Sequence, residues 1–109
     1  MARLTGTVYY LERIALPPGA VLKVQLSDVS RADAPAEVIA GDSMTVTTQV
    51  PIKFSLSYDP HLIVPSHTYV VQARIEVDGK LRFINTSSNP VVLNGQPAFV
   101  DVRVSAVPQ

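Results

Sequence analysis

Hydrophobic and polar residues alternate along four stretches of the chain, and this pattern predicts β-strands, because successive side chains of a strand point to opposite faces. The stretches are 21–29, 52–58, 69–77 and 99–107. We expect their apolar positions to form the core: Leu22, Val24 and Leu26; Ile52, Phe54, Leu56 and Tyr58; Tyr69, Val71, Ala73, Ile75 and Val77; Val100, Val102 and Val104. The polar residues between them, Ser27 included, are expected to face solvent, as in antiparallel strands with one buried face.

Glycine, proline and aspartate mark turns between these strands. The segment 17–19, Pro-Pro-Gly, precedes the first stretch and can fix a change of chain direction. The pair at 78–79, Asp-Gly, follows the third stretch and is typical of a two-residue β-hairpin. A further turn, Asn-Gly-Gln-Pro at 94–97, precedes the last stretch. Pro51 and Pro90 stand at strand starts, where a missing N–H is tolerated.

Helical patterns are weak along the whole chain. The alanine-rich segment SRADAPAEVIAGD is interrupted by Pro35 and Gly41, which break any long helical period. One helical turn is expected after Asp59, which can cap it, with Pro60 in the first position and Pro65 ending it.

The succession of short strands and turns predicts an all-β fold. We expect a single antiparallel, immunoglobulin-like β-sandwich of about seven to eight short strands. The 109 residues fit one domain, 1–109. A domain of this size buries roughly two thirds of the surface of its unfolded chain, so it needs neither a metal ion nor a disulfide to hold its core.

Composition and charge exclude several functions. Hydrophobic residues make up 47% of the chain, too many for a disordered protein. Nine basic and nine acidic residues cancel and are scattered, which argues against nucleic-acid binding and electrostatic membrane attachment. The absence of cysteine excludes disulfides, cysteine-type zinc sites and a thiol nucleophile. No apolar stretch reaches the roughly 18 residues of a membrane span, and the N-terminal residues do not form a signal peptide.

Catalytic motifs are missing from the sequence. There is no Gly-x-Ser-x-Gly nucleophile elbow, and the five glycines form no phosphate-binding loop. Glu76 and Asp78 lie close together, but on a polar face that runs into the hairpin turn, where aspartate suits the turn itself. Glu12 and Arg13 could form an exposed ion pair of little consequence. We therefore predict no enzyme, no catalytic residue and no cofactor.

His61 and His67, with Asp59, are the candidate metal ligands that the sequence offers. They flank a proline-rich loop and lack the i, i+4 spacing of a helical zinc motif, and a metal site also needs further ligands and supporting partners. We therefore predict no metal site. We expect a loop fixed by hydrogen bonds, with Asp59 as a cap and Arg74 reaching a carboxylate; a ligand site at this loop is the alternative.

Aromatic residues point to core packing rather than to base stacking, because most fall on the apolar faces of the strands. They are Tyr9, Tyr10, Phe54, Tyr58, Tyr69, Phe83 and Phe99. The adjacent Tyr9 and Tyr10 must point to opposite faces, so the outward one is a candidate contact for a partner. The sequence Asn-Thr-Ser at 85–87 fits a glycosylation sequon, a frequent chance match.

The segment GTVYYLERIALPPGAVLKVQLSDVSRADAPAEVIA resembles the opening of the YbaY/YscW-type bacterial lipoproteins, which include type III secretion lipoprotein chaperones, or pilotins. The segments VPIKFSLSYDP, HTYVVQARIEVDGKLRF and NPVV resemble the same family in the same order. The resemblance covers residues 6–93, and its most specific part joins Glu-Arg, Pro-Pro-Gly-Ala and Asp-Val-Ser-Arg-Ala-Asp.

The resemblance implies a small β-sandwich in the periplasm, tethered to the outer membrane by an N-terminal lipid. Its secretion members assist the assembly or localisation of a secretin ring, so the implied partner is another envelope protein. This sequence departs from the pattern in having neither a signal peptide nor a lipobox cysteine, so membrane attachment is expected only through a lipid anchor that the chain lacks. The family brings no catalytic residues.

These observations leave three functions to compare. The first is a non-catalytic, chaperone-like envelope domain, which an exposed apolar groove or an unpaired sheet edge would support. The second is a β-sandwich that binds a small molecule or a lipid, which needs a concave apolar pocket. The third is an enzyme, which needs a cleft with convergent titratable residues.

Overall fold

Nine β-strands and one short 3-10 helix make up the described part of the chain, residues 1–94 and 97–108 of a computed structural model. In chain order they are β1 (Ala2–Tyr9), β2 (Val21–Asp28), β3 (Glu37–Thr45), β4 (Ile52–Tyr58), η1 (Pro60–Leu62), β5 (Tyr69–Val77), β6 (Lys80–Ile84), β7 (Pro90–Val91), β8 (Ala98–Arg103) and β9 (Ser105–Ala106).

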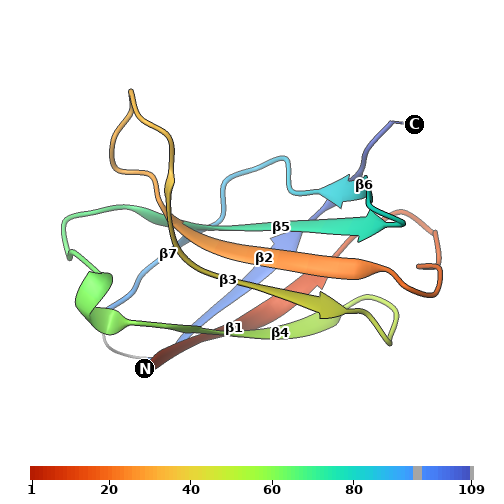
Figure 1. Cartoon of the computed structure of the whole chain (residues 1–109), viewed down its shortest axis with the longest axis horizontal. Helices are drawn as coiled ribbons and strands as arrows, with labels where there is room; N and C mark the ends of the chain where they lie inside the picture. The colour runs from red at the N-terminus through yellow and green to blue at the C-terminus, as the bar shows by residue number, and fades with distance from the viewer. Residues whose placement is uncertain (95–96, 109) are drawn as a thin grey trace.

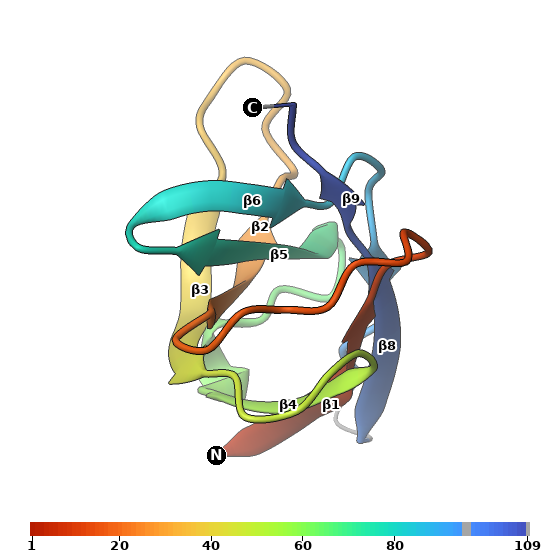
Figure 2. The same ribbon diagram turned by 90° about the vertical axis from the view of Figure 1, so that its right-hand side faces the viewer.

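The strands form two sheets that face each other, as Figures 1 and 2 show. The three-stranded sheet has the order β4-β1-β8. The six-stranded sheet has the order β3-β2-β5-β6-β9, and β7 pairs with β5 beside it. Val104 separates β8 from β9, so the end of the chain passes from one sheet to the other. The predicted all-β sandwich is confirmed.

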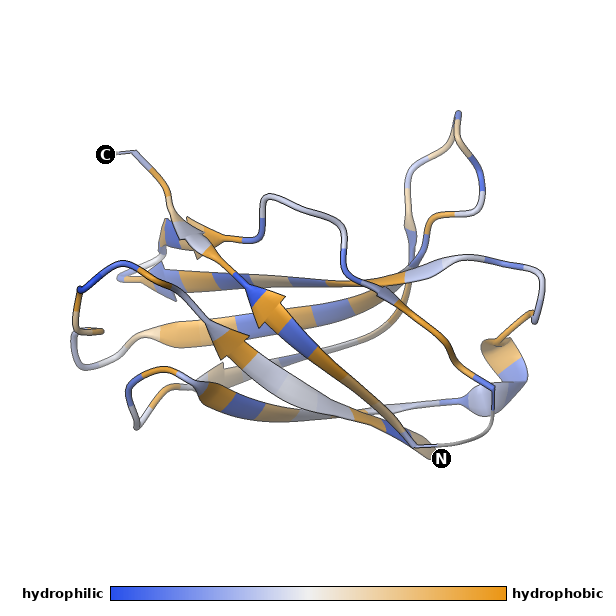
Figure 3. Ribbon diagram, turned by 180° about the vertical axis from the view of Figure 1, so that it is seen from behind, coloured by the Kyte–Doolittle hydropathy of each residue, from blue (hydrophilic) through white to orange (hydrophobic). Residues whose placement is uncertain are grey.

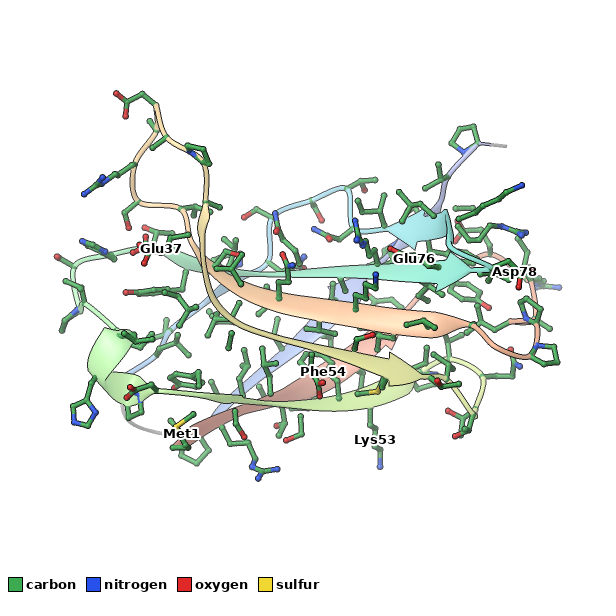
Figure 4. The ribbon with its side chains drawn as sticks, viewed as in Figure 1. Met1, Glu37, Lys53, Phe54, Glu76 and Asp78 are labelled. Atoms are coloured by element: carbon green, nitrogen blue, oxygen red, sulfur yellow. The ribbon has the colours of Figure 1, made fainter. Side chains whose placement is uncertain are left out.

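The side chains between the sheets are the apolar ones that alternation predicts. In β4, Phe54 lies in the core while Lys53 points away from it, as Figure 4 shows. The most deeply buried large side chains come from both sheets: Leu4, Val8, Leu22, Leu26, Val71, Ile75, Val102 and Val104. Because burying a large aliphatic side chain stabilises the fold by roughly 1.5–3 kcal/mol, this shared layer holds the sheets together.

Two of the predicted turns are confirmed. Asp78 and Gly79 join β5 to β6 and both have positive φ angles, 52° and 76°, as a type I′ hairpin turn requires. Gly19, with φ of 85°, lies in the turn before β2, where the N–H of Ala20 donates to the carbonyl of Pro17 at 3.4 Å. The turn predicted at 94–97 includes residues 95–96, which lie outside the described residues.

Four local features differ from the expectations. From Glu37 on, the alanine-rich segment is part of strand β3, because β2 offers a pairing edge along Glu37–Thr45. β8 pairs with β1 in parallel, not antiparallel. Ser27 is buried, because a bulge after Leu26 shifts the pairing with β3. Phe99 is 65% exposed on the outer face of β8 and does not join the core.

Gly6 allows β1 and β8 to approach each other closely. A Cβ atom at Gly6 would lie 1.8 Å from the carbonyl oxygen of Val100 and 2.9 Å from the Cζ atom of Phe54. Val100 is the register partner of Gly6, so its carbonyl cannot move without disturbing the pairing of the two strands. A side chain at position 6 therefore conflicts with the backbone of β8.

We predict that Gly6→Ala lowers the free energy of unfolding by about 1–3 kcal/mol, the usual cost of overpacking a filled core. Gly41→Ala is the matched control, because its new Cβ would meet the carbonyl oxygen of Val24 at an ordinary 3.5 Å. Urea unfolding followed by circular dichroism measures both variants. Equal stability of Gly6→Ala and the wild type would contradict the close contact.

Candidate partner-binding groove

An open, mainly apolar groove of about 460 Å³ lies at one end of the sandwich. One wall is the loop after η1 and the other is the segment that begins at β7. The residues that line it are Ile63, Val64, Pro65, His67, Tyr69, Val91, Val92, Leu93 and Asn94. Figure 3 shows the segment after β7 as a hydrophobic stretch that runs toward the end of the molecule where the N-terminus lies.

The groove carries apolar side chains that the fold itself leaves exposed. Val92 is 76% exposed and Val64 is 41% exposed, and Leu62 of η1, next to the lining residue Ile63, is 52% exposed. Tyr69 is buried and forms the floor. Clustered, exposed apolar side chains around a concave surface are typical of a site that binds another molecule.

Hydrogen bonds hold the loop wall in place. Asp59 caps η1 by accepting from the N–H of His61 at 2.9 Å, which confirms the predicted cap. The N–H of Val64 donates to the hydroxyl oxygen of Tyr69 at 2.8 Å, and the N–H of His67 donates to the carbonyl of Val64 at 2.9 Å. The apolar loop is therefore tied to the first residue of β5 rather than free to collapse onto the core.

His67 links the same wall to the end of β2. Its Nδ1 atom lies 2.6 Å from Oδ2 of Asp28. Asp28 also accepts from the N–H of Ser30 at 2.9 Å. These hydrogen bonds lower the pKa of the Asp28 carboxyl from 3.8 to about 2, and those from Ser30 have a larger effect than the one from His67. The Asp28 carboxylate is thus ionised across the physiological pH range and anchors the loop.

The second wall is held by β5 and by an asparagine. Val91 of β7 pairs with Tyr69, and the N–H of Val71 donates to the carbonyl of Asn89 at 2.9 Å. The Asn89 side-chain amide donates to the carbonyl of Ser87 at 3.1 Å. Because the backbone directly before it is bonded to β5, the exposed Val92 follows a fixed segment.

The two histidines do not form a metal centre. His61 lies 3.0 Å from Asp59, and His67 pairs separately with Asp28. Within residues 1–94 and 97–108, no group of three or more His, Cys, Asp or Glu side chains is placed to hold a metal ion. The loop is instead fixed by the hydrogen bonds described above.

The acidic residues singled out in the sequence serve structure. Glu76 forms ion pairs with Lys23 at 3.2 Å and with Arg74 at 2.9 Å. Arg74 therefore reaches a carboxylate on its own strand, β5, and not one in the loop that it was expected to help fix. Glu12 does not need Arg13: it accepts from the N–H of Ala106 at 2.6 Å, and this hydrogen bond is the main cause of its lowered pKa.

Tyr9 and Tyr10 point to opposite faces, and Tyr9 is the more exposed. Tyr10 is buried, stacks on Phe83 with ring centroids 4.3 Å apart, and donates from its hydroxyl to the carbonyl of Ile14. Burial, and then the charge of Glu12, raise the pKa of Tyr10. Tyr10 is therefore a core residue, while a partner contact at Tyr9 stays a prediction.

The glycosylation match at Asn85 has a structural explanation. The Asn85 side-chain oxygen accepts from the N–H of Ala73 at 2.9 Å, and its amide donates to the carbonyl of Ser87 at 3.1 Å. This asparagine closes the loop after β6, so its amide is already engaged.

Family membership follows from comparison with known proteins. The model of the type III secretion system lipoprotein chaperone (YscW) family matches residues 1–104. The chain belongs to this family. The resemblance noted in the sequence is thereby confirmed, and the matched residues include both walls of the groove.

Two known proteins are similar to this YscW-family chain over nearly its whole length. The uncharacterized lipoprotein YbaY of Escherichia coli (strain K12) is 40% identical over 110 residues, which cover 96% of this chain and 58% of YbaY. The chain thus spans less than two thirds of the length of that relative. The solved structure of an alternative pilotin from the type II secretion system of Vibrio cholerae is 48% identical, with a TM-score of 0.92, over 98% of this chain and 97% of that one.

Neither the groove nor its contacts could be found from periodicity. The sequence predicts a helical turn just before Ile63 and a strand that starts at Pro90, and both occur there. Only the tertiary structure shows that the two runs face the same hollow. Among the described helical residues, none forms a helix that could cross a membrane.

We predict that Asp28→Asn lowers stability most near neutral pH. The carboxyl has a pKa of 3.8 unfolded and about 2 folded, so its ionised form stabilises the fold above pH 3.8, and this contribution disappears as the pH falls toward 2. Urea unfolding of both proteins across this range measures the difference. A difference that stays constant down to pH 2 would contradict the role of Asp28.

Proposed function

We propose that this chain is a non-catalytic, chaperone-like module of the bacterial envelope that binds another envelope protein, in the manner of a pilotin and a secretin. The observation that carries the proposal is the fixed apolar groove between the loop after η1 and the segment after β7. Membership of a family of secretion lipoprotein chaperones supports it, as does the similarity to a pilotin over nearly the whole chain.

The chemistry of the groove favours an apolar segment of a protein partner. Apolar side chains dominate the lining, and Asn94 and His67 stand among them as polar residues. His67 pairs with Asp28 through its Nδ1 atom, and this contact holds its ring against the loop. An amphipathic or extended apolar segment would bury Val64 and Val92, and removing such side chains from water drives association.

We place the protein in the periplasm, associated with the outer membrane through an N-terminal lipid, as its lipoprotein relatives suggest. The N-terminus lies at the same end of the sandwich as η1, as Figure 1 shows. A tether at this end would keep the groove close to the membrane where an outer-membrane partner is assembled.

A small-molecule or lipid-binding role is the second candidate, and the groove is also the observation that favours it. However, the groove and two other hollows of about 400 and 480 Å³ are open to solvent, whereas small-ligand sites usually enclose most of the ligand. An enzyme has less support, because Glu76 and Asp28 are each occupied by structural partners.

Binding to the secretin made by the same bacterium tests the proposal. We expect Val92→Asp to weaken the complex by about tenfold or more, because it places a charge where the partner's apolar side chains are desolvated. Val92 is 76% exposed, so this change should leave the fold intact. Biolayer interferometry with the purified secretin measures the affinity.

Leu11→Asp is the matched control for this experiment. Leu11 is also exposed, at 63%, but follows β1 at the end of the sandwich away from η1. It should bind as the wild type does. Equal affinity of Val92→Asp and Leu11→Asp, or no binding of the wild-type chain to the secretin, would contradict the proposed function.

A further inference from the structure

The outer edge of β8 is unpaired in the described part of the chain. β8 has a single neighbour in its sheet, β1. The N–H of Val104 donates to the carbonyl of Tyr9 at 2.8 Å, which fixes the residues of this ladder that face β1. In a parallel pair, every second residue of a strand bonds to the neighbouring strand. Val100, Val102 and Val104 therefore direct their backbone groups toward β1. Phe99, Asp101 and Arg103 therefore direct their backbone N–H and C=O groups away from it.

No backbone hydrogen bond within the described residues involves these three residues on their outer side. An edge of this kind is a template for another strand, and monomeric proteins often protect such an edge with charged side chains. Here the charges on the edge are Asp101 and Arg103, one of each sign and two positions apart, and both are exposed.

This spacing makes the edge complementary to itself. When two copies of β8 run antiparallel about a two-fold axis at Val102, Asp101 of each copy stands opposite Arg103 of the other. These are also the residues with free backbone groups, so each opposed pair can exchange both of its hydrogen bonds. An axis at Asp101 would instead oppose two like charges, which is unfavourable directly across a sheet.

Side-chain contacts on the outer face leave both charges available. Thr7 donates to Oδ1 of Asp101 at 2.5 Å, so the second carboxylate oxygen is free to accept from an arginine. Arg103 forms no ion pair within the described residues. The charge of Arg103 contributes to the lowered pKa of Glu12, so a pairing with Asp101 of a second copy would compete with this attraction but would displace no ion pair.

We propose that β8 is a dimer interface, at which a second copy of this chain adds its own β8 antiparallel about Val102. The pairing joins two three-stranded sheets into one continuous sheet with the order β4-β1-β8-β8-β1-β4. Such an interface is isologous, with the same surface used by both copies. The groove is lined by the loop after η1 and the segment after β7 and contains no residue of β8, so the dimer carries two grooves.

Sedimentation velocity of the pure protein over a concentration series tests the interface. The wild type should form dimers as concentration rises. Asp101→Arg and Arg103→Asp should each raise the dissociation constant by about tenfold or more, because each places like charges opposite each other at two symmetric positions. The double variant Asp101→Arg/Arg103→Asp restores opposite charges and should dimerise like the wild type.

Lys53→Asp is the matched control, since it changes the net charge as Arg103→Asp does but lies on β4, at the other side of β1. It should leave the dissociation constant unchanged. Circular dichroism of every variant separates loss of the dimer from loss of the fold.

Amide hydrogen exchange gives a second, residue-specific test. In the dimer the amides of Asp101 and Arg103 should become protected as concentration rises, whereas those of Val100 and Val102 are protected in the monomer as well. A wild type that stays monomeric, a dimer that Asp101→Arg leaves intact, or a double variant that folds but does not dimerise would overturn the proposal. A monomer whose Asp101 and Arg103 amides gain protection only when an extended secretin peptide is added would assign the edge to that peptide and also overturn it.

Discussion

The pairing of β1 with both β4 and β8 is the constraint on which the rest of the structure depends. It places the first strand of the chain beside β8, near the chain's end, in parallel. Neighbouring parallel strands cannot be joined by a tight turn, so the intervening chain must cross to the facing sheet and return. Gly6 makes the pairing possible, because the carbonyl of Val100 occupies the space where any side chain would lie.

The candidate groove follows from this connectivity. β7 belongs to the six-stranded sheet, whereas β8 lies beside β1 in the other sheet. The chain therefore leaves the six-stranded sheet after β7, at the end of the sandwich. It passes the loop that joins η1 to β5, whose position is fixed by Tyr69 and by the pairing of His67 with Asp28. Two apolar segments are therefore held apart by their own hydrogen bonds, and Val64 and Val92 stay exposed between them.

The sequence predicts those parts of the fold that depend on local pattern. Alternation identifies the buried faces of β2, β4 and β5, and the chemistry of Asp78-Gly79 identifies the hairpin between β5 and β6. Local pattern fails where pairing between distant strands determines the structure. β3 forms because β2 offers an edge, despite the proline and glycine nearby, and Ser27 is buried by a bulge that alternation cannot anticipate.

The functional site is harder to predict than the fold, for a physical reason. An exposed valine in a groove and a buried valine in a core give the same signal in a sequence, and only the neighbours tell them apart. The residues with recognisable chemistry serve structure: Asp59 caps η1 as predicted, and Glu76 forms ion pairs with Lys23 and Arg74. Of the two adjacent tyrosines, the sequence does not tell which faces outward; Tyr10 is the inward one and stacks on Phe83 in the core.

The central claim is that the apolar end of the sandwich, and not its charged outer face, is where a partner binds. Chemical-shift mapping of the isotope-labelled chain with a soluble fragment of the secretin tests this most directly. The account predicts that the perturbed amides cluster at Ile63, Val64 and 91–93. Perturbations centred instead on Lys23, Arg74 and Glu76, on the outer face of the six-stranded sheet, would contradict it.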